Sequence, residues 1–277
     1  MGHGKMITNL FNRSLDLFKL RDAVNRILIR YFYFLNSDIK IRNDLFRSSG
    51  VPDSLPLPPP HLAYLVAGHF DQERFFKDGL LGAKCIQSIL ETNNLEIDTF
   101  DTVLDFGCGC GRILRHWQKL NGPKFYGCDY NRRLVKWDNE TLSFADIRLN
   151  GEASRLDFED NKFSFIYAIS VFTHMREEVQ NFWVEELTRI LSPGGYLLIT
   201  VHGTTRLHEM SFLERQRFDD GQLVLRNEFH SGENKCAAFH PERYVREKLC
   251  RNLKVVDFIP GGAKDANQDA FLLQKPD

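Results

Sequence analysis

A glycine-rich turn behind a short apolar run constrains this chain more than any other feature. Residues 103–112 read VLDFGCGCGR, in which Asp105 ends the apolar run and glycines follow at alternate positions, Gly107, Gly109 and Gly111. Glycine has no Cβ, so such a turn lets the backbone pass close to a ligand. A helix over residues 112–120 (RILRHWQKL) would then present free N–H groups at its start. A dinucleotide fingerprint, G-x-G-x-x-G, would need glycine where Arg112 stands. This motif alone is also compatible with a strand-to-helix turn that binds no ligand.

Strands and helices alternate after this turn. A second strand is expected at Lys124–Asp129, and its terminal acid comes 18 residues after Gly111. An acid about 20 residues beyond the glycines commonly pairs with ribose hydroxyls in doubly wound folds. Further strands are expected at 145–149, 163–169 and 196–203, helices at 132–140 and 177–191, and a turn at Ser192–Gly195. This alternation predicts an α/β fold, a mostly parallel sheet with helices on both faces.

The last two expected strands behave differently. Residues 253–259 and 269–274 are separated by a Gly-rich loop, PGGAKDAN. The loop is too short for a crossover helix, so this pair of strands must be antiparallel.

The order of these motifs resembles the class I S-adenosylmethionine (SAM)-dependent methyltransferases from Asp101 to the C-terminus. The resemblance rests on D-x-G-x-G-x-G, on the acid that ends the second strand, and on the Leu-Ser-Pro-Gly-Gly turn. It implies a doubly wound, mostly parallel seven-stranded sheet with a C-terminal antiparallel hairpin. The strings SVFTHM, TVHG and NQDAFLLQKP are similar to a bacterial subgroup often encoded with sugar-modifying enzymes.

The resemblance also implies a cofactor site, with SAM as cofactor and S-adenosylhomocysteine as product. Asp105 suits the ammonium of the ligand, the glycines approach its methionine part, and Asp129 can accept from both ribose hydroxyls. Family members often place Asp beside the adenine, where this chain has Asn150. The expected cofactor contacts are Asp105, Gly107, Cys108, Gly109, Gly111, Asp129, Tyr130, Asn150, Gly151 and Ser170.

Two histidines are the candidate catalytic residues. His174 follows the fourth strand and His202 follows the fifth, so both belong to the ligand-binding edge of the expected sheet. Methyl transfer needs proximity and orientation, plus a base where the acceptor must lose a proton, and histidine titrates near neutral pH. The alternative is that each imidazole only shapes its loop. His208, His230 and His240 are weaker candidates in or near an insertion at 204–240, which we interpret as the acceptor-site cover.

A missing motif and the net charge narrow the possible methyl acceptors. The chain lacks the Asn/Asp-Pro-Pro-aromatic string of enzymes that methylate DNA amino groups or glutamine amides, and has Ile169–His174 there instead. The net charge of −1 gives no global attraction to nucleic acid. We expect a hydroxyl of a small molecule, sugar or glycolipid as acceptor. A protein or RNA methyltransferase, or a SAM-binding partner subunit without turnover, are the alternatives.

Cysteines and hydropathy set the expected compartment. The six cysteines show no C-x-x-C or zinc-finger spacing, so we expect reduced thiols in a cytoplasmic protein and no metal site. No apolar stretch is long enough to span a membrane.

The chain is expected to divide near residue 60. Residues 1–50 carry nine basic and four acidic side chains, a net charge of +5, with apolar residues near helical spacing. A Pro-rich connector follows, and residues 61–277 form the methyltransferase domain. We expect helices in the extension that pack on the main domain or on a second subunit in an oligomer. The alternative is a basic amphipathic segment in peripheral contact with an anionic membrane.

Overall fold

The computed structural model describes residue 24, residues 27–227 and residues 236–277. The chain folds as two compact units, Met1–Phe75 and Phe76–Asp277. Most of the first half of the expected helical extension, residues 1–23 and 25–26, and His230 lie outside the described residues. Among the described residues, no helix is long and apolar enough to cross a membrane.

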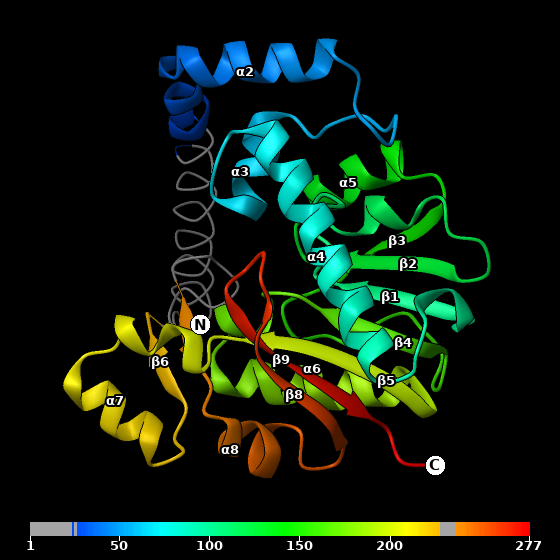
Figure 1. Ribbon diagram of the computed structural model, residues 1–277, viewed down its shortest axis with the longest axis vertical. Helices are drawn as coiled ribbons and strands as arrows, with labels where there is room; N and C mark the ends of the chain where they lie inside the picture. Colours follow the sequence, from blue (N-terminus) through cyan, green and yellow to red (C-terminus); the bar gives the residue numbers. More distant parts are fainter. Residues whose placement is uncertain (1–23, 25–26, 228–235) are drawn as a thin grey trace, which may run out of the picture. The chain divides into compact units, whose positions relative to one another are not determined.

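A seven-stranded sheet forms the larger unit (Figure 1). Its strands run in the order β3-β2-β1-β4-β5-β9-β8. Strands β1 to β5 are mutually parallel, and β9 is antiparallel to both β5 and β8. The fold expected from the sequence, including the terminal antiparallel pair, is therefore confirmed. The strands are β1 (Thr102–Phe106), β2 (Lys124–Asp129), β3 (Ala145–Leu149), β4 (Phe163–Ala168), β5 (Leu191–Val201), β8 (Lys254–Ala263) and β9 (Gln268–Gln274).

Helices cover the sheet as the alternation predicts. Helix α5 (Arg132–Thr141) follows β2, and the side chain of Asn131 caps it by accepting from the Arg133 N–H. Helix α6 (Glu177–Ile190) follows β4 and buries its apolar stripe in the main core, together with α8 (Glu242–Tyr244) and the turn Val245–Leu249. The long helix α4 (Gln72–Thr92) crosses the sheet on the other side in Figure 1.

Two local expectations are wrong. The segment behind the glycines is not a long helix but a 3₁₀ turn, Leu114–Trp117. The carbonyl of Arg112 lies against Gly79 of α4, and the His116 N–H donates to Ile113 instead of continuing an α-helical ladder from Arg112. The Ser192–Gly195 turn is also part of β5, which begins at Leu191; Gly194 has φ +70°, and the pairing with β4 shifts register there.

The insertion after β5 contains a separate small sheet. It begins with a 3₁₀ segment, η4 (Thr204–Glu209), and helix α7 (Phe212–Asp219). Strands β6 (Val224–Arg226) and β7 (Ala237–Phe239) then pair antiparallel. Phe218, Val224 and Phe239 pack together beneath them.

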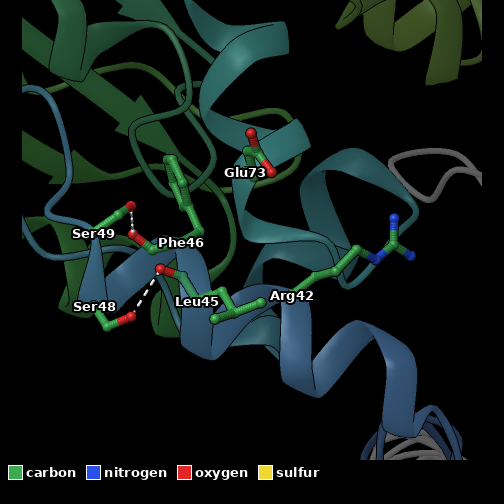
Figure 2. Close-up of a pocket in the computed structure, with 6 residues that line it drawn as sticks. All are labelled: Arg42, Leu45, Phe46, Ser48, Ser49 and Glu73. Atoms are coloured by element: carbon green, nitrogen blue, oxygen red, sulfur yellow. Dashed lines mark hydrogen bonds between the residues drawn. The ribbon is translucent and has the colours of Figure 1, made fainter.

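The smaller unit is helical where it is described. Residues 27–35 form a helix, followed by α2 (Ser37–Ser48) and α3 (Pro60–Ala67), while the Pro-rich stretch between the last two has no helix or strand. Asn43 is the buried residue of α2: its amide donates to the Phe70 carbonyl and accepts from the Gln72 N–H. Figure 2 shows an open hollow beside this helix, lined by Arg42, Leu45, Phe46, Ser48, Ser49 and Glu73.

Candidate active site

The glycine loop is held against the end of β2. The N–H groups of Gly107 and Cys108 both donate to the Cys128 carbonyl, at 2.8 and 3.0 Å. Gly107, Gly109 and Gly111 have φ of +77°, +64° and +69°, a region that favours glycine. The alternating glycines are therefore required by the backbone of this turn.

Asp129 is next to this loop, as the topology predicts. Its carboxylate accepts from two backbone N–H groups, Gly109 at 3.0 Å and Asn131 at 2.7 Å. Burial raises the pKa of Asp129 to about 6, and these two hydrogen bonds oppose the rise. A carboxylate oxygen accepts more than one hydrogen bond, so both oxygens retain capacity for a hydroxyl pair.

Asp105 lies at the neighbouring strand end, deeper in the fold. Tyr167 is directly opposite it in the β1–β4 register, and the tyrosine hydroxyl hydrogen-bonds its carboxylate. The same hydroxyl accepts from the indole of Trp117 at 3.0 Å. Burial raises the pKa of Asp105 to about 7, against the lowering effects of Tyr167 and of the nearby Arg112. A cationic ligand next to this buried carboxyl would stabilise its ionised form.

The loop after β3 places the residues expected to hold adenine. The Asn150 amide donates to the Gly151 carbonyl at 2.8 Å, and the Gly151 N–H donates to Ser154 Oγ at 3.0 Å. Asn150 Oδ1 is buried, and the part of the chain that the structure describes gives it no hydrogen-bond partner. A lone buried acceptor fits the amino group of a ligand. Tyr130, beyond the end of β2, is half exposed.

The loop after β4 contacts the glycine loop. A Cβ on Gly107 would lie 2.6 Å from a methyl of Val171. Ser170 has φ +61°, and its N–H donates to Thr200 Oγ1 at 2.8 Å. Gln268 donates to Ser170 Oγ and accepts from Thr200, so β9 also fixes this loop.

His174 and His202 come together at this edge, with ring centroids 6.1 Å apart. His174 Nδ1 lies 2.9 Å from the Cys236 carbonyl, so Nδ1 bears the proton and Nε2 carries the lone pair that can accept one. Burial lowers the pKa of His174, and burial lowers that of His202 to about 4. His202 Nδ1 is buried without a partner among the described residues. Both imidazoles are therefore neutral near pH 7.

The remaining histidines differ in kind. His240 is buried at the end of β7 and its Nε2 lies 2.8 Å from the Gln180 amide oxygen, whereas His208 is mostly exposed. All six cysteines are buried, and none of them forms a disulfide. Over the described ranges, no group of three His, Cys, Asp or Glu side chains is placed to hold a metal ion.

Several residues that shape the site were not foreseen from the sequence. Tyr167 orients Asp105. Asp265, which lies in the loop between β8 and β9, forms an ion pair with Arg112 at 2.9 Å. Asp138 of α5 is fully buried behind the glycine loop beside the Cys108 thiol. Local spacing gives no signal for these pairs. The only sequence signal near Asp265 was the unusually Gly-rich connection PGGAKDAN, in which this residue lies.

Known proteins match this fold and its central motifs. Residues 104–199 match the family described as methyltransferase domain. The sterol 24-C-methyltransferase ERG6B of Gibberella zeae is 28% identical over 45% of this chain and 34% of its own length. The tRNA (carboxymethyluridine(34)-5-O)-methyltransferase of Arabidopsis thaliana is 30% identical over 49% of this chain and 30% of its own. The matched stretch thus spans about a third of these relatives.

A solved structure shows the same fold over more of the chain. The Burkholderia thailandensis 1,6-didemethyltoxoflavin-N1-methyltransferase, solved with its bound substrate and S-adenosylhomocysteine, aligns with a TM-score of 0.52 and 17% identity. The alignment covers 80% of this chain and 92% of that one. Residues 104–199 of this chain thus match the methyltransferase domain family, and the strand order is that of the class I methyltransferase fold.

Proposed function

We propose that this chain transfers a methyl group from SAM to a hydroxyl of a small molecule, sugar or glycolipid. The observation that carries the SAM part is a pair of buried acids at the ends of neighbouring strands. Asp105 and Asp129 flank the glycine loop, and burial raises the pKa of each. A ligand with an ammonium group and a pair of hydroxyls would stabilise the carboxylate form of both acids.

The chain residues divide the work of cofactor binding. Asp105 receives the ammonium, Asp129 the ribose hydroxyls, and Asn150 Oδ1 the adenine amino group. The backbone hydrogen bonds that Asp129 accepts keep its carboxylate oriented before the ligand arrives, which lowers the entropy cost of binding. SAM supplies the electrophilic methyl group on its sulfonium.

The hydroxyl acceptor is supported by the two neutral histidines after β4 and β5. A neutral imidazole with its Nδ1–H on a carbonyl presents Nε2 as a proton acceptor, and a hydroxyl must lose a proton when it is methylated. The names of the relatives specify a sterol carbon and a tRNA oxygen, and that of the solved structure a ring nitrogen. The relatives therefore do not decide the acceptor atom, and our proposal of an oxygen acceptor rests on the histidine pair.

Calorimetry of SAM binding tests the cofactor site. Asp129→Ala removes the acceptor of both ribose hydroxyls and is expected to weaken SAM binding by about 2–4 kcal/mol, since charge-assisted hydrogen bonds are strong. Asp157→Ala is the matched control, because its side chain is fully exposed. Unchanged SAM affinity in Asp129→Ala would contradict the assignment, and binding of NAD in place of SAM would refute the whole proposal.

Product analysis tests the acceptor class separately. The protein, labelled SAM and a panel of sugars, glycolipids, amines and RNA are incubated, and the methylated atom is identified by mass spectrometry and NMR. A methyl ether is expected. Methylation at nitrogen or carbon would overturn the hydroxyl part and leave the SAM part intact. SAM binding without any product would favour a partner subunit without turnover.

A further inference from the structure

The smaller unit presents large apolar side chains to solvent. Ile27, Tyr31, Phe34, Leu35, Ile41 and Leu45 are all more than half exposed, and we refer to them as the apolar surface. At 100° per residue, the first four lie on one side of helix 27–35. Soluble proteins rarely leave several large apolar side chains exposed on one side of a helix, so these residues indicate an interaction site.

These helices are attached to their own unit by the opposite side. Tyr33, on the far side of helix 27–35, packs on Phe70 with ring centroids 5.5 Å apart. Helix α2 is held by polar contacts, through Asn43 and through Arg47, whose guanidinium donates to Gln72 at 2.6 Å. The helices are therefore held to their unit by side chains other than those of the apolar surface. The apolar surface is not needed for packing within this unit.

Basic side chains lie beside the apolar surface. Arg30 and Arg42 are exposed, and Figure 2 shows Arg42 and Leu45 on the same side of α2. The Lys40 ammonium lies 4.1 Å from the centroid of the Phe34 ring. Residues 1–50 have a net charge of +5 in a chain of net −1, which leaves −6 for residues 51–277. Within the described stretch 27–50, four basic side chains outnumber two acidic ones, a net charge of +2 next to the apolar surface.

We infer that the apolar surface and its arginines dock on an anionic membrane surface. Among the described residues no helix is long and apolar enough to cross a bilayer. We therefore place helix 27–35 in the interface, with Phe34, Leu35 and Tyr31 among the acyl chains and headgroups. A symmetric contact with a second copy would bring two basic faces together, which costs free energy, whereas anionic lipids neutralise them. This inference is independent of the proposed methyl acceptor.

Vesicle sedimentation of the full chain tests the docking. Wild type is expected to pellet with vesicles of phosphatidylcholine and phosphatidylserine, less in high salt, and not with phosphatidylcholine alone. Phe34→Ser and the double change Arg30→Glu, Arg42→Glu should each lower binding by about tenfold or more. The matched controls Phe212→Ser and the pair Arg215→Glu, Arg243→Glu should bind like wild type. Phe212 is as exposed as Phe34, and both control arginines pair with a carboxylate, as Arg42 does with Asp71.

Thermal melts and gel filtration of the same variants exclude other occupants. An exposed Phe34 predicts an unchanged Tm for Phe34→Ser. A Tm lowered by several degrees would mean that Phe34 is covered by the rest of the chain, and a wild-type dimer that Phe34→Ser dissociates would assign the surface to a second copy. Either result overturns the inference, as do equal vesicle binding by surface and control variants and binding to RNA without binding to vesicles.

Discussion

Asp105 shows how one buried residue links stability to cofactor binding. Its folded pKa of about 7 lies above the ordinary value of 3.8 because burial disfavours the carboxylate. Between these two values the folded state holds a proton that the unfolded state has lost, so the free energy of unfolding falls as pH rises. Above pH 7 the whole of this destabilisation is present, and a cationic ligand at Asp105 would remove it.

The first residue-scale prediction is a pH-dependent gain in stability. Asp105→Asn replaces the titrating group, so its Tm relative to wild type should increase by about 5–10 °C between pH 4 and pH 8. Melts at fixed ionic strength, without ligand, measure this difference. Asp157→Asn, at an exposed position, should show no such trend. A difference that stays constant with pH would show that Asp105 does not titrate in this range.

The second residue-scale prediction concerns His174 as general base. His174→Ala should lower turnover on the order of 10²–10⁴-fold and leave SAM affinity nearly intact. Because burial lowers the pKa of His174, the wild-type rate should rise with pH below 6.5 and be level at neutral pH. His208→Ala, at an exposed site, is the control. A variant that keeps most of its turnover would leave orientation alone as the mechanism.

At the scale of elements, α4 and the glycine loop pack backbone against backbone. A Cβ on Gly79 would lie 2.0 Å from the Arg112 carbonyl oxygen, whereas one on Gly82 would meet the ends of the Ile113 and Asp265 side chains at 2.9 and 3.0 Å. Side-chain ends can move and the backbone here cannot. The two glycines, three residues apart on one helix, therefore make a matched pair.

The element-scale prediction is a graded cost of the same substitution. Gly79→Ala should destabilise the protein by about 2–3 kcal/mol through overpacking, and should weaken SAM binding because it displaces the glycine loop. Gly82→Ala should cost under about 1 kcal/mol, since the helix propensity of alanine offsets a smaller clash. Urea unfolding and calorimetry measure both effects. Equal costs at the two positions would argue against the tight contact at Gly79.

At the scale of the whole molecule, the ion pair between Arg112 and Asp265 joins segments 153 residues apart. The Asp265 side chain is almost fully buried and that of Arg112 is largely so, in contrast to the exposed pair Arg148–Asp146. The loop between the last two strands thereby holds the turn behind the first strand.

The whole-molecule prediction compares these two pairs. Asp265→Asn should destabilise the protein by about 3 kcal/mol, because it leaves a buried guanidinium without its carboxylate. Asp146→Asn should cost at most about 1 kcal/mol, as is usual for surface pairs. Urea denaturation of both variants gives the comparison. A cost below 1 kcal/mol at Asp265 would show that solvent replaces the lost partner.

The sequence by itself determined which segments of the larger unit form the main strands, their succession along the chain and the position of the glycine loop. These depend on local apolar runs, on turn residues such as Gly107, and on a connection too short to cross the sheet. The predicted cofactor residues stay predictions, although the fold brings Asp105, Asp129 and the glycine loop together as expected. The physical reason is that parallel strands end at one edge, so a residue at a strand end needs no long-range information to be placed there.

Only the tertiary structure decided what these residues contact. Tyr167 on Asp105, Gly109 on Asp129, and Asp265 on Arg112 are pairs between distant segments, and local spacing does not encode them. The short 3₁₀ turn after the glycines has the same origin: the segment has helical composition, yet the approach of Gly79 directs the Arg112 carbonyl away from a helical ladder. Packing between segments overrides local propensity wherever two backbones meet this closely.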